Sequence, residues 1–162
     1  MTAIETGRRI SVEVNGTTYE RDVEARRLLI HFIRDDLDLT GSHIGCDTGN
    51  CGACSVILDG VLVKSCMLLA VQADGASVRT VESLADGGEV SPLQQAFHSQ
   101  HALQCGFCTP GMLISATSLL EQNAAPSEDE IRKALQGNIC RCTGYWNIIK
   151  AVKDASGQDV EP

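Results

Sequence analysis

The sequence has few basic residues and no long apolar segment. Lysine and arginine number 13 against 21 aspartate and glutamate residues, which gives a formal net charge of −8. Nucleic acid and anionic membrane surfaces recruit basic faces, so neither is an expected partner. No apolar run reaches the ~18 residues of a membrane span, and the first residues lack the apolar stretch of a signal peptide. We therefore expect a cytoplasmic protein.

Aromatic residues are also scarce, at 4% of the chain, although 43% of the residues are hydrophobic. This apolar content supports a packed core and excludes a disordered tail, but few large rings are available to fix the interior. The sequence does contain eight cysteines in 162 residues. In a reducing cytoplasm, clustered cysteines more often bind metal than form disulfides, so they are candidate metal ligands.

The first half of the sequence alternates apolar and polar residues, a pattern typical of half-buried strands. We predict a helix at 26–37 and strands at 10–14, 17–23, 55–58, 61–63 and 76–81. Asn15-Gly16 and Asp59-Gly60 are expected to form two-residue hairpin turns, because both positions of such turns favour φ > 0. One helix among short strands predicts a small α+β domain over residues 1–83.

The second half has the spacing of helices. Start and stop signals predict four of them, at 92–101, 112–122, between 127 and 137, and from about 145 onward. Ser127 and Glu130 form a capping box, and Trp146, the sole tryptophan, is expected to anchor the core. These helices predict a four-helix bundle over residues 84–162, with a boundary near 83–90 where both patterns break.

Four cysteines of the first half have the spacing C-x4-C-x2-C, followed by a fourth after eleven intervening residues. This first cysteine set comprises Cys46, Cys51, Cys54 and Cys66. The spacing is that of plant-type [2Fe–2S] ligands. A loop that wraps an anionic cluster must approach it closely, which Gly45, Gly49 and Gly52 permit. The alternative is a zinc loop, but structural zinc usually takes two short paired motifs.

The second half carries the spacings C-x2-C and C-x-C. This second cysteine set comprises Cys105, Cys108, Cys140 and Cys142. Each pair directly precedes a predicted helix, and two helix N-termini directed at one point stabilise thiolates and an anionic cluster. Spacing alone leaves zinc open, as well as a dithiol redox site at Cys105 and Cys108. The first set beside it favours a second iron–sulfur cluster, because two clusters allow electrons to cross the chain.

Three stretches, HIGCDTGNCGACSV, LQCGFCTPGML and GNICRCTGYWNIIKAV, resemble the small iron–sulfur subunit of molybdenum hydroxylases. That family includes xanthine dehydrogenase, aldehyde oxidoreductases and aerobic carbon monoxide dehydrogenase. The likeness covers about residues 8–155, with all three motifs in the expected order. The segment LLIHFIRDDLDLTGSHIGCDT most resembles carbon monoxide dehydrogenase, whereas Gly49, Asn50 and Trp146 depart from the residues usual there.

The resemblance implies a β-grasp, ferredoxin-like domain followed by a helical domain, each with one [2Fe–2S] cluster. It implies a large partner subunit with a molybdenum-pterin dinucleotide and a medium one with FAD, as a dimer of heterotrimers. Electrons would pass from molybdenum through both clusters to FAD, and no residue of this chain would be catalytic. Gln104 would hydrogen-bond the pterin, Cys142 would lie beside it, and the Cys46–Cys54 loop would face the flavin subunit.

Two other functions remain open at this point. One is the small subunit of a sister enzyme that oxidises an aldehyde or an N-heterocycle. The other is a free-standing ferredoxin-like carrier, although a soluble shuttle needs only one exposed cluster. The sequence therefore predicts an electron-transfer subunit of an oxidoreductase, and the resemblance favours a carbon monoxide dehydrogenase-like enzyme. It leaves the substrate itself undefined, because the substrate would bind to another chain.

Overall fold

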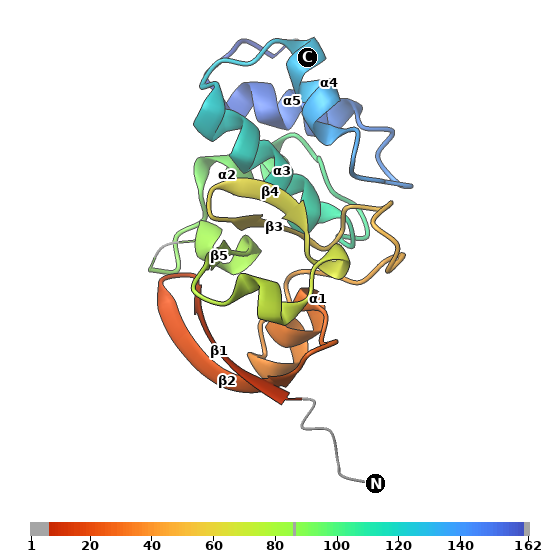
Figure 1. Ribbon diagram of the computed structural model, residues 1–162. Coiled ribbons are helices and arrows are strands. Elements are labelled where there is room, and N and C mark those ends of the chain that lie inside the picture. Colours follow the sequence, from red (N-terminus) through yellow and green to blue (C-terminus); the bar gives the residue numbers. More distant parts are fainter. Residues whose placement is uncertain (1–6, 86, 161–162) are drawn as a thin grey trace, which may run out of the picture.

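The computed structural model describes residues 7–85 and 87–160, so Asp86, inside the predicted domain boundary, lies outside the described residues. Within these residues, five strands form one mixed sheet in the order β2-β1-β5-β3-β4 (Figure 1). Neighbouring strands are antiparallel except for β1 and β5, which are parallel. The strands are β1 (Gly7–Val14), β2 (Thr17–Glu24), β3 (Ser55–Leu58), β4 (Val61–Lys64) and β5 (Ser77–Arg79).

Both predicted hairpin turns are present. Asn15 and Gly16 have φ angles of 52° and 78°, and Asp59 and Gly60 have φ angles of 47° and 81°. These are the left-handed conformations that a two-residue hairpin turn requires at both central positions. The turns join β1 to β2 and β3 to β4.

One face of the sheet is buried under a short helix. Alternate residues of β1, namely Ile10, Val12 and Val14, are buried, as the sequence alternation predicts. They pack with residues of α1 (Leu29–His31) and of the π-helix that continues it (Phe32–Asp36). This core supports the ferredoxin-like half of the α+β fold.

The predicted helix over 26–37 is longer than the observed helical segment. Arg27 accepts a hydrogen bond from Ala70 N at 2.7 Å, and Leu28 forms an isolated β-bridge with Leu69. These contacts come from a distant segment and hold the chain extended up to the first residue of α1. Helical periodicity carries no signal for such a tertiary contact, so it overestimates the length of the helix.

Three short 3-10 helices connect the remaining elements of this half: Ser65–Met67, Ala70–Ala73 and Val81–Leu84. The last of them shortens the strand predicted at 76–81 to β5 alone. The reason is local, because the backbone N–H and the hydroxyl of Ser83 both donate to Thr80 O, at 3.0 and 2.8 Å, and turn the chain.

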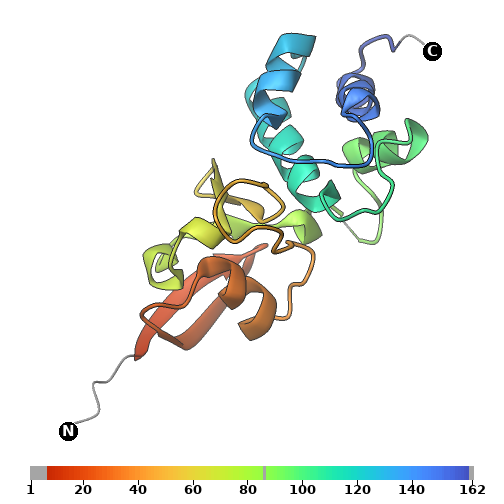
Figure 2. The same cartoon turned by 90° about the vertical axis from the view of Figure 1, so that its right-hand side faces the viewer.

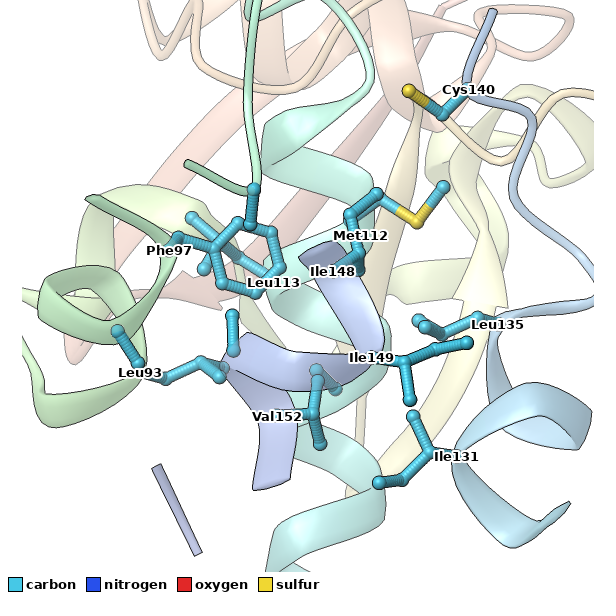
Figure 3. Packing of buried hydrophobic residues seen from close by; sticks show 14 residues of the cluster. Leu93, Phe97, Met112, Leu113, Ile131, Leu135, Cys140, Ile148, Ile149 and Val152 are labelled. Carbon is cyan, nitrogen blue, oxygen red and sulfur yellow. The ribbon is translucent and has the colours of Figure 1, made fainter. Parts of the chain in front are cut away.

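Four helices follow in the described part of the chain: α2 (Pro92–Ser99), α3 (Thr109–Gln122), α4 (Glu128–Leu135) and α5 (Trp146–Ala155). Capping boxes start α2, through Ser91 and Gln94, and α4, through Ser127 and Glu130 as predicted. None of the described helices is long and apolar enough to cross a membrane. Side chains from all four helices form one core, which includes Leu93, Phe97, Met112, Ile131, Leu135, Ile148, Ile149 and Val152 (Figure 3).

Trp146 is not part of this core, so the prediction of a core anchor was wrong. It is the first residue of α5, its exposed fraction is 52%, and Lys150 Nζ lies 5.8 Å from its ring centroid. Aliphatic side chains and Phe97 fill the interior instead. A single aromatic residue at the start of a helix does not reveal which way its ring points.

The helices stack on the β3–β4 end of the sheet, while the β1–β2 hairpin lies at the far end (Figures 1 and 2). α3 packs directly against β3. At the surface, Arg79 of β5 donates two hydrogen bonds to the carboxylate of Glu121 of α3, at 2.8 and 2.7 Å. The two halves therefore meet where α3 lies against β3 and β5.

Candidate metal centres

The first cysteine set lies in the loop that precedes β3 and in the short 3-10 helix after β4. Cys46 and Cys51 are half-buried, whereas Cys54 and Cys66 are buried. The backbone N–H groups of Thr48 and Cys51 donate to Cys46 Sγ, at 3.5 and 3.3 Å. Amide hydrogens directed at a sulfur are the expected surroundings of an anionic cluster, because they offset its charge.

Glycine permits the close approach that this loop requires. A Cβ atom at Gly45 would lie 2.9 Å from Cys51 Sγ and 3.3 Å from the ring of Phe107. At Gly49, which has φ of 75°, it would lie 3.0 Å from the side chain of Met67. The loop thus needs glycine at both positions, and any side chain at Gly45 would displace a cysteine.

The second cysteine set is assembled from two loops that are far apart in the sequence. The loop before α3 carries Cys105 and Cys108, and the loop before α5 carries Cys140 and Cys142. Cys105 Sγ and Cys142 Sγ are 3.5 Å apart and exposed. The Cys108 thiol lies near that of Cys140; burial and this neighbour raise its pKa, and both thiols lie deeper than the first pair. Each pair therefore takes one thiol from each loop.

The surroundings of the thiols shift their pKa values in opposite directions. Hydrogen bonds from the Thr48 side chain and from the backbone of Thr48 and Cys51 lower the pKa of the Cys46 thiol to about 6. Burial raises the pKa of Cys66 to about 11 and that of Cys108 to about 12. Metal binds the thiolate form, so loading the site must release protons from the buried thiols.

The pairing of thiols in the second set fits the ligands of a binuclear cluster. A structural zinc site needs four ligands around one point, whereas [2Fe–2S] takes two cysteines on each iron. The side-chain pair of Cys105 and Cys142 and that of Cys108 and Cys140 match the second arrangement.

A buried hydroxyl beside the second set supports the same fit. Thr109 Oγ1, in the residue after Cys108, is buried and has no hydrogen-bond partner in the described part of the chain. Buried hydroxyls normally have a hydrogen-bond partner, so the Thr109 hydroxyl is available to donate to a sulfur atom of a bound cluster. The residues present therefore fit a [2Fe–2S] group.

The structure brings together the two residues expected on the pterin side. The side-chain amide of Gln104 donates to Cys142 O at 3.1 Å, and both residues are exposed. This hydrogen bond connects the loop before α3 to the loop before α5.

Sequence reasoning missed the exposed apolar side chains around the second set. Phe107, Ile139 and Trp146 are 48%, 55% and 52% exposed. Phe107 also stacks on His43, beside the first set, with ring centroids 4.7 Å apart. The sequence contained a signal for this apolar surface. Phe107 lies between Cys105 and Cys108, and Ile139 directly precedes Cys140. A loop residue that faces only water is usually polar, so an apolar residue at these positions indicates a contact.

Comparisons with known proteins agree with this geometry. A family model described as a 2Fe-2S iron-sulfur cluster binding domain matches residues 12–85, and one described as a [2Fe-2S] binding domain matches residues 80–153. The nicotine 6-hydroxylase small subunit of Paenarthrobacter nicotinovorans is 56% identical, over 92% of this chain and 90% of its own length. The caffeine dehydrogenase subunit gamma of a Pseudomonas species is 53% identical, over 91% and 90%.

A solved structure shows the same fold. Quinoline 2-oxidoreductase from Pseudomonas putida 86 contains a chain that superimposes with a TM-score of 0.92 at 46% identity. The match covers 94% of this chain and 96% of that one. The similarity therefore extends over the sheet, the helices and both cysteine sets.

Proposed function

Since this chain belongs to the small iron–sulfur subunits of the molybdenum hydroxylase family, we propose that it carries electrons from a molybdenum-pterin site in a large partner subunit to FAD in a medium one. When bound, each [2Fe–2S] cluster supplies reversible one-electron chemistry. The first cysteine set holds one cluster and the second set holds the other. One observation carries the proposal: Ile139 N, in the residue before Cys140, donates to Cys51 O at 2.9 Å and so joins the two sets directly.

The second set lies on the pterin side in this proposal. The exposed amide of Gln104 and the adjoining Cys142 are the contacts to the pterin, held in place by their mutual hydrogen bond. The loop that contains Cys46 and Cys51 lies on the flavin side. Each cysteine set contains thiols that are half-buried or exposed, so a partner subunit can approach either set. A free-standing carrier would need only one accessible cluster.

The whole complex is proposed as a cytoplasmic dimer of heterotrimers. Within the chain, we propose that the ferredoxin-like domain spans residues 1–83 and the helical domain spans 84–162. The supporting observation is that the sheet and its core end with β5, while the second core begins with α2.

For the substrate class we propose an N-heterocycle. The similar proteins described above are named for nicotine, caffeine and quinoline, which are all N-heterocycles. Carbon monoxide is the second candidate, favoured by the segment LLIHFIRDDLDLTGSHIGCDT. The substrate itself would bind to the large subunit.

The test is native purification of the chain with its partners. We expect two further subunits, and four irons with four acid-labile sulfides per copy of this chain, from its two [2Fe–2S] domains. Anaerobic addition of nicotine, quinoline or a purine should bleach the visible absorbance, and carbon monoxide should not. Stoichiometric zinc without labile sulfide, or an unaccompanied monomer, would contradict the proposed function. If carbon monoxide alone bleached the absorbance, the substrate would be carbon monoxide and not an N-heterocycle.

A further inference from the structure

The carbonyl oxygen of Gly52 is the centre of the contact between the two halves. Gly52 lies between Cys51 and Cys54 of the first set. Its oxygen accepts hydrogen bonds from Ser55 N at 3.1 Å, from Ser55 Oγ at 2.7 Å and from Asn138 Nδ2 at 3.1 Å. The Ser55 bonds are local, whereas Asn138 reaches this oxygen from the helical half.

Asn138 is buried, with an exposed fraction of 4%, and both ends of its amide are used. Nδ2 donates to Gly52 O, and Oδ1 accepts from Ser115 Oγ of α3 at 2.9 Å. Its backbone oxygen accepts from the Tyr145 hydroxyl at 3.2 Å, and that hydroxyl accepts in turn from Cys140 N at 3.0 Å. Asn138 thus connects the first cysteine loop to α3 through its side chain, and it contacts the second cysteine loop through its backbone oxygen.

The backbones around this amide are in direct contact. A Cβ atom at Gly52 would overlap Gly137 O and lie 2.7 Å from Asn138 Nδ2, and a Cβ atom at Gly111 would overlap Gly52 O. In the same place, Ile139 N donates to Cys51 O at 2.9 Å. The distance between the two cysteine sets is therefore set by one small group of buried contacts.

We propose that Asn138 is a positioning residue that fixes the separation of the two cysteine sets. A buried amide with two fixed partners resists displacement, because moving it leaves the amide and the Ser115 hydroxyl unpaired and removes the hydrogen bond that reaches Gly52 O from the helical half. The claim concerns the geometry of two [2Fe–2S] domains. Only its consequence for turnover rests on the proposed function, since the rate of electron transfer falls steeply with distance.

The test uses the native complex that carries Asn138→Ala. Reduced [2Fe–2S] clusters are paramagnetic, so two clusters held close together broaden or split each other's EPR signals. In the fully reduced complex we expect the variant to lose at least half of this mutual splitting. The iron content and the g values of each cluster should stay unchanged, because no ligand has been touched.

Two control variants separate positioning from simple loss of stability. Ile131→Ala opens a cavity in the core of the helices away from the contact. It should leave the splitting unchanged, although it lowers the melting temperature by at least as much as Asn138→Ala does. Asn147→Ala removes an exposed amide, which donates to His101 O at 3.3 Å, and should change neither property. If either control reduces the splitting as much as Asn138→Ala does, the positioning role is refuted.

A milder variant covers the case in which Asn138→Ala does not assemble. Ser115→Ala removes only the donor to Asn138 Oδ1, and it should reduce the splitting in the same direction but by less. Unchanged splitting in both Asn138→Ala and Ser115→Ala, or in Ser115→Ala alone if the first fails, would overturn the proposal. Failure of the proposed function has a different signature, namely absence of the partner subunits while the two clusters still interact.

Discussion

At the scale of single residues, the eight cysteines divide into two groups of four that a ligand substitution should separate. Cys51 belongs to the first set and Cys108 to the second. Serine is nearly isosteric with cysteine, but its alkoxide is a harder and more basic ligand than a thiolate. A single substitution should therefore remove or shift one cluster and leave the other intact.

We expect Cys51→Ser to halve the iron and labile sulfide of the complex. Substrate should then still reduce the cluster of the second set, while the flavin stays oxidised and turnover falls by at least a hundredfold. Cys108→Ser should instead block reduction of both the surviving cluster and the flavin. Anaerobic substrate addition followed by EPR and visible spectroscopy distinguishes the two. Rapid flavin reduction in a Cys51→Ser complex that lacks the first cluster would reverse or refute the order of electron flow.

Gly111 gives a second prediction at this scale. Replacing a helical glycine by alanine usually stabilises a protein by ~1 kcal/mol, but a Cβ atom here would overlap Gly52 O. We expect Gly111→Ala to destabilise the chain by about 1–3 kcal/mol, the cost of an overpacked contact. Gly7→Ala is the control, because its Cβ would meet only Val23 O at an ordinary 3.8 Å. A raised melting temperature for Gly111→Ala would show that the contact can relax.

At the scale of elements, local signals were sufficient for the hairpins and for the capped starts of α2 and α4. Asn15-Gly16 and the capping box at Ser127 act within four residues of chain, so the sequence contains their whole cause. The length of α1 and the outward position of Trp146 depend on segments elsewhere, and both were mispredicted. The end of an element is thus predictable where neighbouring residues cap it, and it is not predictable where contacts with a distant strand or helix determine it.

The same distinction holds for the two cysteine sets. Spacing alone predicted the division of the eight cysteines into two sets, because ligand spacing is a local property. It gave no indication that Asn138 contacts Gly52, 86 residues away, or that Phe107 stacks on His43. The sequence therefore did not predict the contacts that connect the two sets, although each residue involved is, or lies within two positions of, a predicted ligand or glycine.

The α4 cap supplies a prediction for an element. Ser127 Oγ accepts from Glu130 N, and Glu130 Oε2 accepts from Ser127 N at 2.8 Å. We expect Ser127→Ala to destabilise the chain by about 1 kcal/mol. Amide exchange in α4 measures it, and Ser99→Ala, which removes a hydroxyl from the end of α2, is the control. Equal effects of the two substitutions would show that the cap has no special role.

This cap also has a pH dependence of defined sign. The Ser127 side chain and backbone lower the pKa of Glu130 below its ordinary value. A group with a lowered pKa in the folded state stabilises the fold above its unfolded pKa, and it loses this effect as the pH falls through the folded value. Protection of the α4 amides should therefore decrease in acid in the native chain, and this decrease should be smaller in Ser127→Ala.

At the scale of the whole molecule, the exposed apolar residues near the second set predict where a partner binds. Trp146 is 52% exposed, so Trp146→Ala should change the stability of the chain by no more than ~0.5 kcal/mol. Buried aromatic residues are frequent hot spots of interfaces, so the same substitution should weaken co-purification with the large subunit by about tenfold or more. Thr18→Ala, on the hairpin at the far end of the sheet, should change neither. Undiminished co-purification of Trp146→Ala would exclude this face.

The pairing of thiols from separate loops has a further consequence for the covalent topology of the chain. Cys105 and Cys142 are 37 residues apart, and the segment between them contains the whole of α3 and α4. A cluster bound by both loops therefore closes a ring through metal–sulfur bonds, as a cross-link does. Loop-closure entropy for a ring of this size corresponds to about 4 kcal/mol at 25 °C. Iron is in this sense a structural component of the helical half, and its removal by a chelator should lower the melting temperature of that half more than any single substitution considered above.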